Sequence, residues 1–268
     1  MQDDKSAPSV VVGIDGSETA IQAAHWAVAE AVELNVPLRL VYVTKATHSS
    51  SDDYELDVHK GKSSLQLAQN AIEATGRPVK VETAIVTGPP SVALIAESQN
   101  AGLICVGTVG IDRYARSILG STATELAAKA HCPVAVIRPH DDGESSGDIS
   151  WIAVAVNNDP GNDVVVAHAL REARLRGAPV LAVRGGRNTG STEDLDARVA
   201  QWRQHYPDVH IYPIAEHSDL TSFLRHCDER LQLVVIGGSQ ADELAQIVGP
   251  AGRSILHHAK VSVLVVRN

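Results

Sequence analysis

Apolar residues in the first half of the chain follow two alternating patterns. Residues 9–14 (SVVVGI) form a continuous, mostly β-branched run, which is typical of a strand buried on both faces of a parallel sheet. After a break at Asp15-Gly16-Ser17, apolar residues recur at helical spacing as far as Val32. The alternation continues, and it predicts further strands at residues 38–43, 79–86, 103–106 and 134–137, separated by helices. Strands that alternate with helices indicate a parallel sheet with right-handed crossovers.

The second half of the chain repeats this cycle. Strand-like runs occupy residues 151–156, 179–183, 209–214, 233–236 and 261–266, and helical patterns occupy residues 164–176, 193–205, 220–230 and 254–259. Two segments also echo each other in sequence, because ELNVPLRLVYV matches RLRGAPVLAVR and CPVAVIR matches VSVLVVR. These matches indicate an internal duplication of one βα unit.

The segment between the two halves, residues 139–149, is composed of Pro, Gly, Ser and acidic residues, which is typical of a linker. We therefore predict an α/β fold with two tandem, doubly wound domains, each built on a five-stranded parallel sheet. The predicted domains span residues 1–140 and 148–268. The polar, acidic residues 44–57 are predicted to be a mobile loop beside the first sheet, with no chemistry of their own.

Composition excludes several classes of protein. The net charge is −9, and both halves of the chain are acidic, which argues against a protein that binds nucleic acid through the phosphate backbone. No apolar run approaches the roughly 18 residues of a membrane helix, and the polar start MQDDKSAPS is not typical of a signal peptide. The 3 cysteines show no CxxC spacing, so we expect reduced thiols, no structural zinc and a cytoplasmic location.

Candidate chemistry follows the first and fourth predicted strands. In a doubly wound sheet, ligands bind at the carboxyl ends of the strands where the winding reverses. The glycine-rich pattern GTVG-x9-GS begins there, and it contains Gly107, Gly110, Gly120 and Ser121. Glycines permit close approach of phosphate oxygens, and a helix that starts at Gly120-Ser121 offers free N–H groups and the positive end of its dipole. We interpret this pattern as a phosphate cradle; the alternative is that the glycines serve only as turns and a helix cap.

Asp15 ends the first predicted strand. A carboxylate at this position can accept hydrogen bonds from ribose hydroxyls, as acidic residues do in other dinucleotide-binding sheets. The alternative roles are an Asx-turn with Gly16-Ser17 or a helix N-cap. We favour the ligand role because of the glycine pattern.

The motifs VVVGIDGS, Gly88-x-Pro90, GTVG-x9-GS and CPVAVIRP resemble those of the universal stress protein family. The resemblance covers residues 9–139 closely and extends to the second half in layout, as in the tandem two-domain members of mycobacteria and other actinobacteria. It implies an ATP-binding fold of the adenine nucleotide alpha hydrolase type, with strand order 3-2-1-4-5. It also implies a homodimer and a regulatory role in stress or dormancy.

The resemblance also assigns contacts to individual residues. It places Asp15 at the ribose, and Val43, through its backbone, at the adenine. The phosphates would be surrounded by Gly107, Gly110, Gly120 and Ser121.

The second half departs from this pattern at three positions. Asn157 stands where the first half has Asp15, Gln240 replaces the second glycine, and Gly249-Pro250 replaces the glycine–serine pair. Proline lacks an N–H group. We expect the second domain to keep the fold and to bind nucleotide poorly; the alternative is that Gly237 and Gly249 suffice.

The sequence leaves several functions open. We favour a module that binds ATP, orders residues 111–119 on binding and signals to an unidentified protein partner, rather than an enzyme. The alternatives are a slow ATPase or phosphotransferase, a nucleotide-free dimerisation scaffold, and a protein that binds cyclic AMP or another adenine nucleotide. The chain has no GxxxxGK[ST] motif, and its 12 histidines show no regular ligand spacing. A Mg²⁺ ion would therefore be bound through the ATP phosphates.

Overall fold

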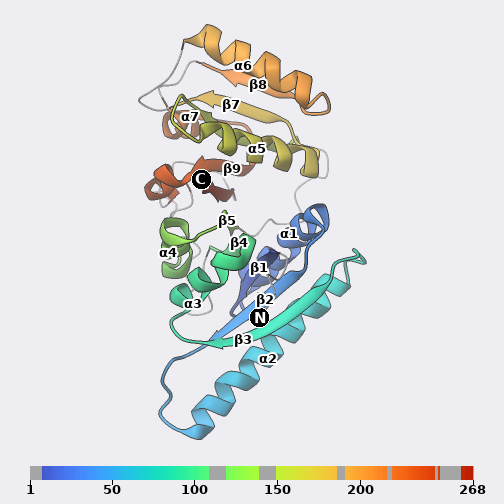
Figure 1. The fold of residues 1–268 in the computed structure, drawn as a ribbon, viewed down its shortest axis with the longest axis vertical. Helices are drawn as coiled ribbons and strands as arrows, with labels where there is room; N and C mark the ends of the chain where they lie inside the picture. The colour runs from blue at the N-terminus through green and yellow to red at the C-terminus, as the bar shows by residue number, and fades with distance from the viewer. Residues whose placement is uncertain are drawn as a thin grey trace, which may run out of the picture. The chain divides into compact units, whose positions relative to one another are not determined.

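Continuous segments rich in β-branched residues form the central strands of the protein (Figure 1). The structure, a computed structural model, describes residues 8–108, 119–138, 149–185, 191–215, 219–244, 247 and 261–267. The chain divides into two units, residues 1–139 and residues 140–268. We refer to them as the first and second domain and describe each by itself.

The first domain alternates strands and helices. Its elements are β1 (Ser9–Ile14), α1 (Glu18–Leu34), β2 (Leu38–Thr44), α2 (Ser51–Glu73), β3 (Val81–Thr87), α3 (Pro90–Glu97), the 3₁₀ helix η1 (Ser98–Asn100), β4 (Ala101–Gly107), α4 (Ser121–Lys129) and β5 (Val134–Ile137). The strands are parallel and lie in the order β3-β2-β1-β4-β5, which confirms the predicted 3-2-1-4-5 order. Helix α1 contacts α2, and α3 contacts α4, so the two pairs cover opposite faces of the sheet.

The centre of this sheet is β1. Val10, Val11 and Val12 are at most 1% exposed, as expected for a strand covered on both faces. Helix α1 begins where the Ser17 hydroxyl accepts a hydrogen bond from the Ala20 amide, and it ends at Asn35 in the left-handed conformation. Its buried face consists largely of alanine, and small side chains allow a helix to lie close to the sheet.

The second domain has the same strand order. Its elements are β6 (Trp151–Val156), α5 (Asn162–Arg176), β7 (Val180–Arg184), α6 (Thr192–His205), β8 (Ile211–Ile214), α7 (Leu220–His226), β9 (Leu231–Gly237), the 3₁₀ helix η2 (Gly238–Glu243) and β10 (Ser262–Val266). The strands are parallel in the order β8-β7-β6-β9-β10. The predicted α/β class is therefore confirmed. The helix predicted at residues 254–259 and most of the predicted linker lie outside the described residues.

The prediction of a loop at residues 44–57 was wrong for its second half. Helix α2 begins at Ser51, and the hydroxyl of the N-cap residue Ser50 accepts a hydrogen bond from the Asp53 amide at 3.1 Å. The acidic residues Asp52 and Asp53 lie in the first turn, where negative charge favours a helix. The negative charges that suggested a solvated loop therefore lie at the N-terminus of a helix. No helix in the described parts of the chain is long and apolar enough to span a membrane.

Candidate functional site

A cavity of about 470 Å³ opens in the first domain at the carboxyl ends of β1, β2 and β4. Five of the six residues predicted to bind nucleotide line it, namely Asp15, Val43, Gly107, Gly120 and Ser121. The sixth, Gly110, lies outside the described residues. The structure thus brings together residues from four separate elements or their ends.

Asp15 follows the last residue of β1. Its Oδ1 atom accepts hydrogen bonds from the Ser17 amide at 2.9 Å and from the Ser17 hydroxyl at 2.6 Å. Gly16 lies between them with φ of 88°, a conformation that favours glycine. Oδ2 makes no hydrogen bond within the described residues. The Asx-turn and a ligand role are therefore compatible, because the turn uses one oxygen and the other remains an acceptor.

Val43 lies where β2 extends past β1. The pairing of these strands ends at Ile14 opposite Tyr42, whereas β2 continues to Thr44. The Leu38 amide donates to Lys80 O, and Thr44 O accepts from the Gly88 amide, so the even-numbered residues of β2 pair toward β3. The backbone of Val43 consequently faces the other side, at the end of β1. Because the register pairs Ile14 with Tyr42, the Val43 amide belongs to this pairing, and the Val43 carbonyl is the main-chain group that a ligand can reach.

Gly107 and Gly120 have different physical roles. A Cβ atom on Gly107 would lie 2.5 Å from Thr19 Oγ1 and 2.9 Å from the Thr19 carbonyl carbon, so the start of α1 requires glycine here. Gly120 is the N-cap of α4 and provides no side-chain cap, and its own amide donates to Thr108 O at 2.7 Å. The first amides of α4, beginning at Ser121, are therefore arranged to receive an anion.

The other end of the cavity contains residues that the sequence motifs did not reveal. Tyr42, Lys45, Asp57 and Lys60 line it together with Val43. Asp57 accepts hydrogen bonds from the Tyr42 hydroxyl at 3.1 Å, the Lys45 amide at 3.0 Å and His48 Nε2 at 2.9 Å. These contacts join positions 9 to 15 residues apart. No short motif marks them, because they depend on α2 beginning at Ser51.

Electrostatics at this end favour an ionised Asp57. Burial acts to raise the pKa of Asp57, but hydrogen bonds from the Lys45 amide, the His48 ring and the Tyr42 hydroxyl outweigh burial and lower it. Burial, the hydrogen bond to Asp57 and the charges of Asp57 and Asp15 raise the pKa of Tyr42 to about 12. Tyr42 therefore remains a neutral hydroxyl donor over the physiological pH range.

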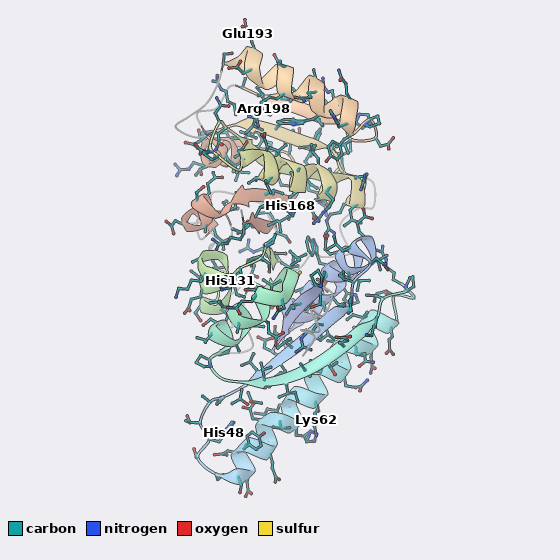
Figure 2. The ribbon with its side chains drawn as sticks, in the orientation of Figure 1. His48, Lys62, His131, His168, Glu193 and Arg198 are labelled. Atoms are coloured by element: carbon teal, nitrogen blue, oxygen red, sulfur yellow. The ribbon has the colours of Figure 1, made fainter. Side chains whose placement is uncertain are left out.

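The corresponding position in the second domain is filled. At the end of β6, Arg198 of α6 donates from Nη1 to Asn157 O at 2.8 Å and from Nη2 to Asp163 Oδ1 at 2.8 Å. Its guanidinium also lies 5.1 Å from the centroid of the Trp202 ring, within range of a cation–π contact. Among the described residues, the cavity beside Asn157 and Arg198 measures about 10 Å³. Figure 2 labels Arg198 in this domain.

Metal-ligating side chains do not gather into a binding site in the described parts of the chain. No group of 3 or more His, Cys, Asp or Glu side chains is arranged there to hold a metal ion. Of the Cys residues, Cys105 and Cys132 are buried and Cys227 is partly exposed, all as free thiols.

Comparison with known proteins gives consistent matches. A family model described as the Universal stress protein family matches residues 8–138. Universal stress protein Rv2624c of Mycobacterium tuberculosis is 52% identical, covering 97% of this chain and 96% of that protein. A solved universal stress protein from Archaeoglobus fulgidus matches with a TM-score of 0.71 at 18% identity, over 98% of this chain and 97% of that one. A universal stress protein in complex with cAMP is 25% identical, with a TM-score of 0.42 over 50% of this chain and 99% of that one.

Proposed function

Because the chain belongs to the universal stress protein family, we propose that its first domain binds an adenine nucleotide, with ATP as the ligand, and acts as a regulatory module. The predicted family is thereby confirmed, and the nucleotide is the proposal. The observation that carries it is the cavity that gathers Asp15, Val43, Gly107, Gly120 and Ser121.

The order of the groups across the sheet supports a nucleotide in one orientation. Strands β2, β1 and β4 are consecutive, and neighbouring strands lie about 4.8 Å apart. The backbone carbonyl of Val43, a carboxylate oxygen at Asp15 and the N-terminus of α4 therefore follow one another in a row. This sequence of groups suits a base, a ribose and a phosphate chain, respectively.

Among the described residues, the groups at the phosphate end suit the binding of a phosphate chain. This end is lined by Gly107, Gly120, Ser121, Thr122 and Ala123, and the first residues of α4 offer amide donors together with the hydroxyls of Ser121 and Thr122. Such donors hold a phosphate chain, whereas phosphoryl transfer also requires a group that positions the nucleophile. A Mg²⁺ ion would be held by the ATP phosphates in this arrangement, with water as its remaining ligands.

One nucleotide per chain is part of the proposal. In the second domain, Arg198 occupies the space beside Asn157, and an amide replaces the carboxylate. We further propose that the protein acts in the cytoplasm as a homodimer and signals to a regulatory protein partner. Conformational coupling would then depend on the difference in ATP affinity between two states of the first domain.

Calorimetric titration of ATP into nucleotide-stripped protein tests the proposal. Asp15→Asn preserves the Oδ1 acceptor of the turn but removes the carboxylate that faces the ribose. Because a hydrogen bond to a charged group contributes about 1.5–3 kcal/mol, we expect the ATP affinity to fall roughly 10- to 100-fold. Asp159→Asn is the matched control, since it removes an equal charge from an exposed residue in the equivalent loop of the second domain.

The alternatives give different results in the same experiment. Wild-type protein that binds neither ATP nor cAMP would leave a nucleotide-free scaffold. Tighter binding of cAMP than of ATP would identify a different ligand. Multiple-turnover ATP hydrolysis that Asp15→Asn abolishes would replace the regulatory module with an ATPase.

A further inference from the structure

We propose that Asp57 is a positioning residue for the base end of the cavity, fixing the backbone around Val43 without contacting the ligand. The inference rests on the proposed nucleotide site and adds to it a residue from α2, outside the glycine motif and the strand ends. Asp57 is 15% exposed and lies beside the cavity.

The carboxylate of Asp57 joins three segments of the chain. Oδ1 accepts from the Tyr42 hydroxyl near the end of β2, and Oδ2 accepts from the Lys45 amide and His48 Nε2 in the segment that follows. The His48 ring, which Figure 2 labels, packs edge-on against Tyr54 with centroids 5.3 Å apart. Both carboxylate oxygens are thus engaged by the protein itself. Asp57 consequently has little capacity left for a ligand, and its effect on a ligand must pass through the groups that it holds.

Those groups flank the backbone that faces the nucleotide. Tyr42 and Lys45 lie on either side of the dipeptide Val43-Thr44, and both are tied to the same carboxylate. Thr44 is fully buried, and its hydroxyl hydrogen-bonds with Val86 O and Thr87 Oγ1 of β3. Val43 is therefore held between fixed neighbours, and its carbonyl lies beyond the last paired residue of β1, on the cavity side.

The packing of α2 places Asp57 at this point. A Cβ atom on Gly61 would lie 2.6 Å from Cδ1 of Tyr42, so the Tyr42 ring rests directly on the helix backbone. Glycine inside a helix is unfavourable relative to alanine, and the close contact with the ring accounts for its presence. Asp57 and Gly61 are four residues apart, on the same face of α2. One face of the helix therefore receives both the ring and the hydroxyl of Tyr42.

The substitution Asp57→Asn tests this role. The amide oxygen can still accept from the Lys45 amide and His48, but the NH₂ group then faces the Tyr42 hydroxyl, which must accept instead of donate, and all of these hydrogen bonds lose the carboxylate charge. We expect the ATP affinity to fall about tenfold, which corresponds to roughly one lost hydrogen bond to a charged group. The affinity for ribose 5-triphosphate, which has no base, should stay within about twofold of wild type because Asp15 and α4 are unchanged.

The measurement is a displacement titration of bound ATP by ribose 5-triphosphate in each variant. Tyr42→Phe removes only the hydroxyl and should give an intermediate loss of ATP affinity. Glu55→Gln removes a charge from an exposed residue of the same helix and serves as the matched control. Hydrogen exchange of the ligand-free protein should show faster exchange at the Lys45 amide in Asp57→Asn than in the control.

The outcomes separate this inference from the proposed function. Wild-type protein without ATP binding refutes the nucleotide site itself. Equal losses for ATP and ribose 5-triphosphate would show that Asp57 supports the whole domain, and unchanged ATP affinity would show that it supports none of the site; either result overturns the inference. If ribose 5-triphosphate fails to displace ATP from wild-type protein, the base provides most of the affinity, and the comparison of Asp57→Asn with Glu55→Gln decides.

Discussion

The two domains share one strand order and differ at the end of the first strand. In the first domain, β1 is followed by a short turn in which Asp15 bonds Ser17, and a cavity of about 470 Å³ remains. In the second domain, Arg198 lies beside the segment after β6, and the cavity there measures about 10 Å³ among the described residues. The fold is therefore compatible with an open or a closed site at the same point.

Closure in the second domain is a network of local hydrogen bonds. Asn162 Oδ1 accepts from the Asn157 amide at 3.0 Å, and Asn162 Nδ2 donates to Ala155 O at 2.9 Å. Arg198 completes the network at Asn157 O. Asn157 and Asn162 are at most 7% exposed, so these buried polar groups are satisfied by the protein rather than by a ligand. The comparison shows that Arg198 of α6 lies at the end of the first strand of its domain, whereas α2 leaves a cavity at the equivalent position of the first domain.

The largest contrast between the domains is expected at the paired glycines Gly107 and Gly237. A Cβ on Gly107 would meet Thr19 atoms at 2.5 Å and 2.9 Å, whereas one on Gly237 would meet Val165 at 3.4 Å. Overpacking costs about 1–3 kcal/mol of stability. We expect Gly107→Ala to lower the free energy of unfolding by an amount near the upper end of this range, and to lower Tm by roughly 6 °C or more. Gly237→Ala should stay within about 0.5 kcal/mol of wild type.

Thermal unfolding followed by circular dichroism measures both variants. Equal Tm values for the two would show that α1 adjusts at its first turn and that Gly107 is not required for packing. If Gly107→Ala lowers the ATP affinity without a change in Tm, Gly107 serves ligand contact and not packing.

These glycines show what the sequence could and could not reveal. The spacing GTVG-x9-GS singled out Gly107 and Gly120, and both line one cavity, because strand ends and helix starts follow from local patterns. The reason for glycine at position 107 was not predictable, since it depends on Thr19, 88 positions earlier in the chain. The fold class was predictable for the same local reasons that located the strand ends, whereas the strand order was implied by the resemblance to the universal stress protein family.

The two residues that most affect the cavities were missed for a related reason. Arg198 and Asp57 each lie on a helix that packs against the second strand of its domain, and their partners are distant in sequence. The apolar periodicity that predicts such helices gives no information on which polar side chain reaches the sheet edge. The acidic run before Asp57 even suggested a loop, because charges at a helix N-terminus and charges in a solvated segment look alike in sequence.

Removal of the Arg198 side chain tests what closes the second site. Arg198→Ala loses the hydrogen bonds to Asn157 O and Asp163, and we expect the free energy of unfolding to fall by about 1–2 kcal/mol. The enlarged cavity still has an amide at Asn157 in place of a carboxylate. We therefore expect calorimetry to give an unchanged ATP stoichiometry of one per chain.

Binding of a second ATP to Arg198→Ala would contradict the expected stoichiometry of one per chain. It would show that occupancy by the guanidinium, rather than the missing carboxylate, keeps the second domain free of nucleotide. Arg225→Ala, which removes the same type of side chain from an exposed position of α7 in the same domain, is the control for loss of a cationic residue.

The smallest expected difference between the domains is in how a fall in pH changes their stability. Burial, and then the charge of Arg171, lower the pKa of His168 on α5 below its ordinary 6.5, while Glu172 acts in the opposite direction. The unfolded chain therefore binds a proton at this residue more readily, so its contribution to stability is complete above pH 6.5 and is lost as the pH falls below that value. Asp57 has a lowered pKa, so its contribution in the first domain is lost only below its ordinary 3.8.

Between pH 7 and pH 5, acid should consequently weaken the second domain through His168 while the contribution of Asp57 to the first remains. Nδ1 of His168 is buried without a hydrogen-bond partner among the described residues, which fits a neutral ring. We expect His168→Gln, which keeps a neutral polar side chain at all pH values, to reduce the fall in the urea midpoint between pH 7 and pH 5. The fluorescence of Trp151 and Trp202 reports on the second domain and that of Trp26 on the first, so single-tryptophan variants assign the change. An identical pH dependence in wild type and His168→Gln would mean that other titrating groups determine the response of the second domain to acid.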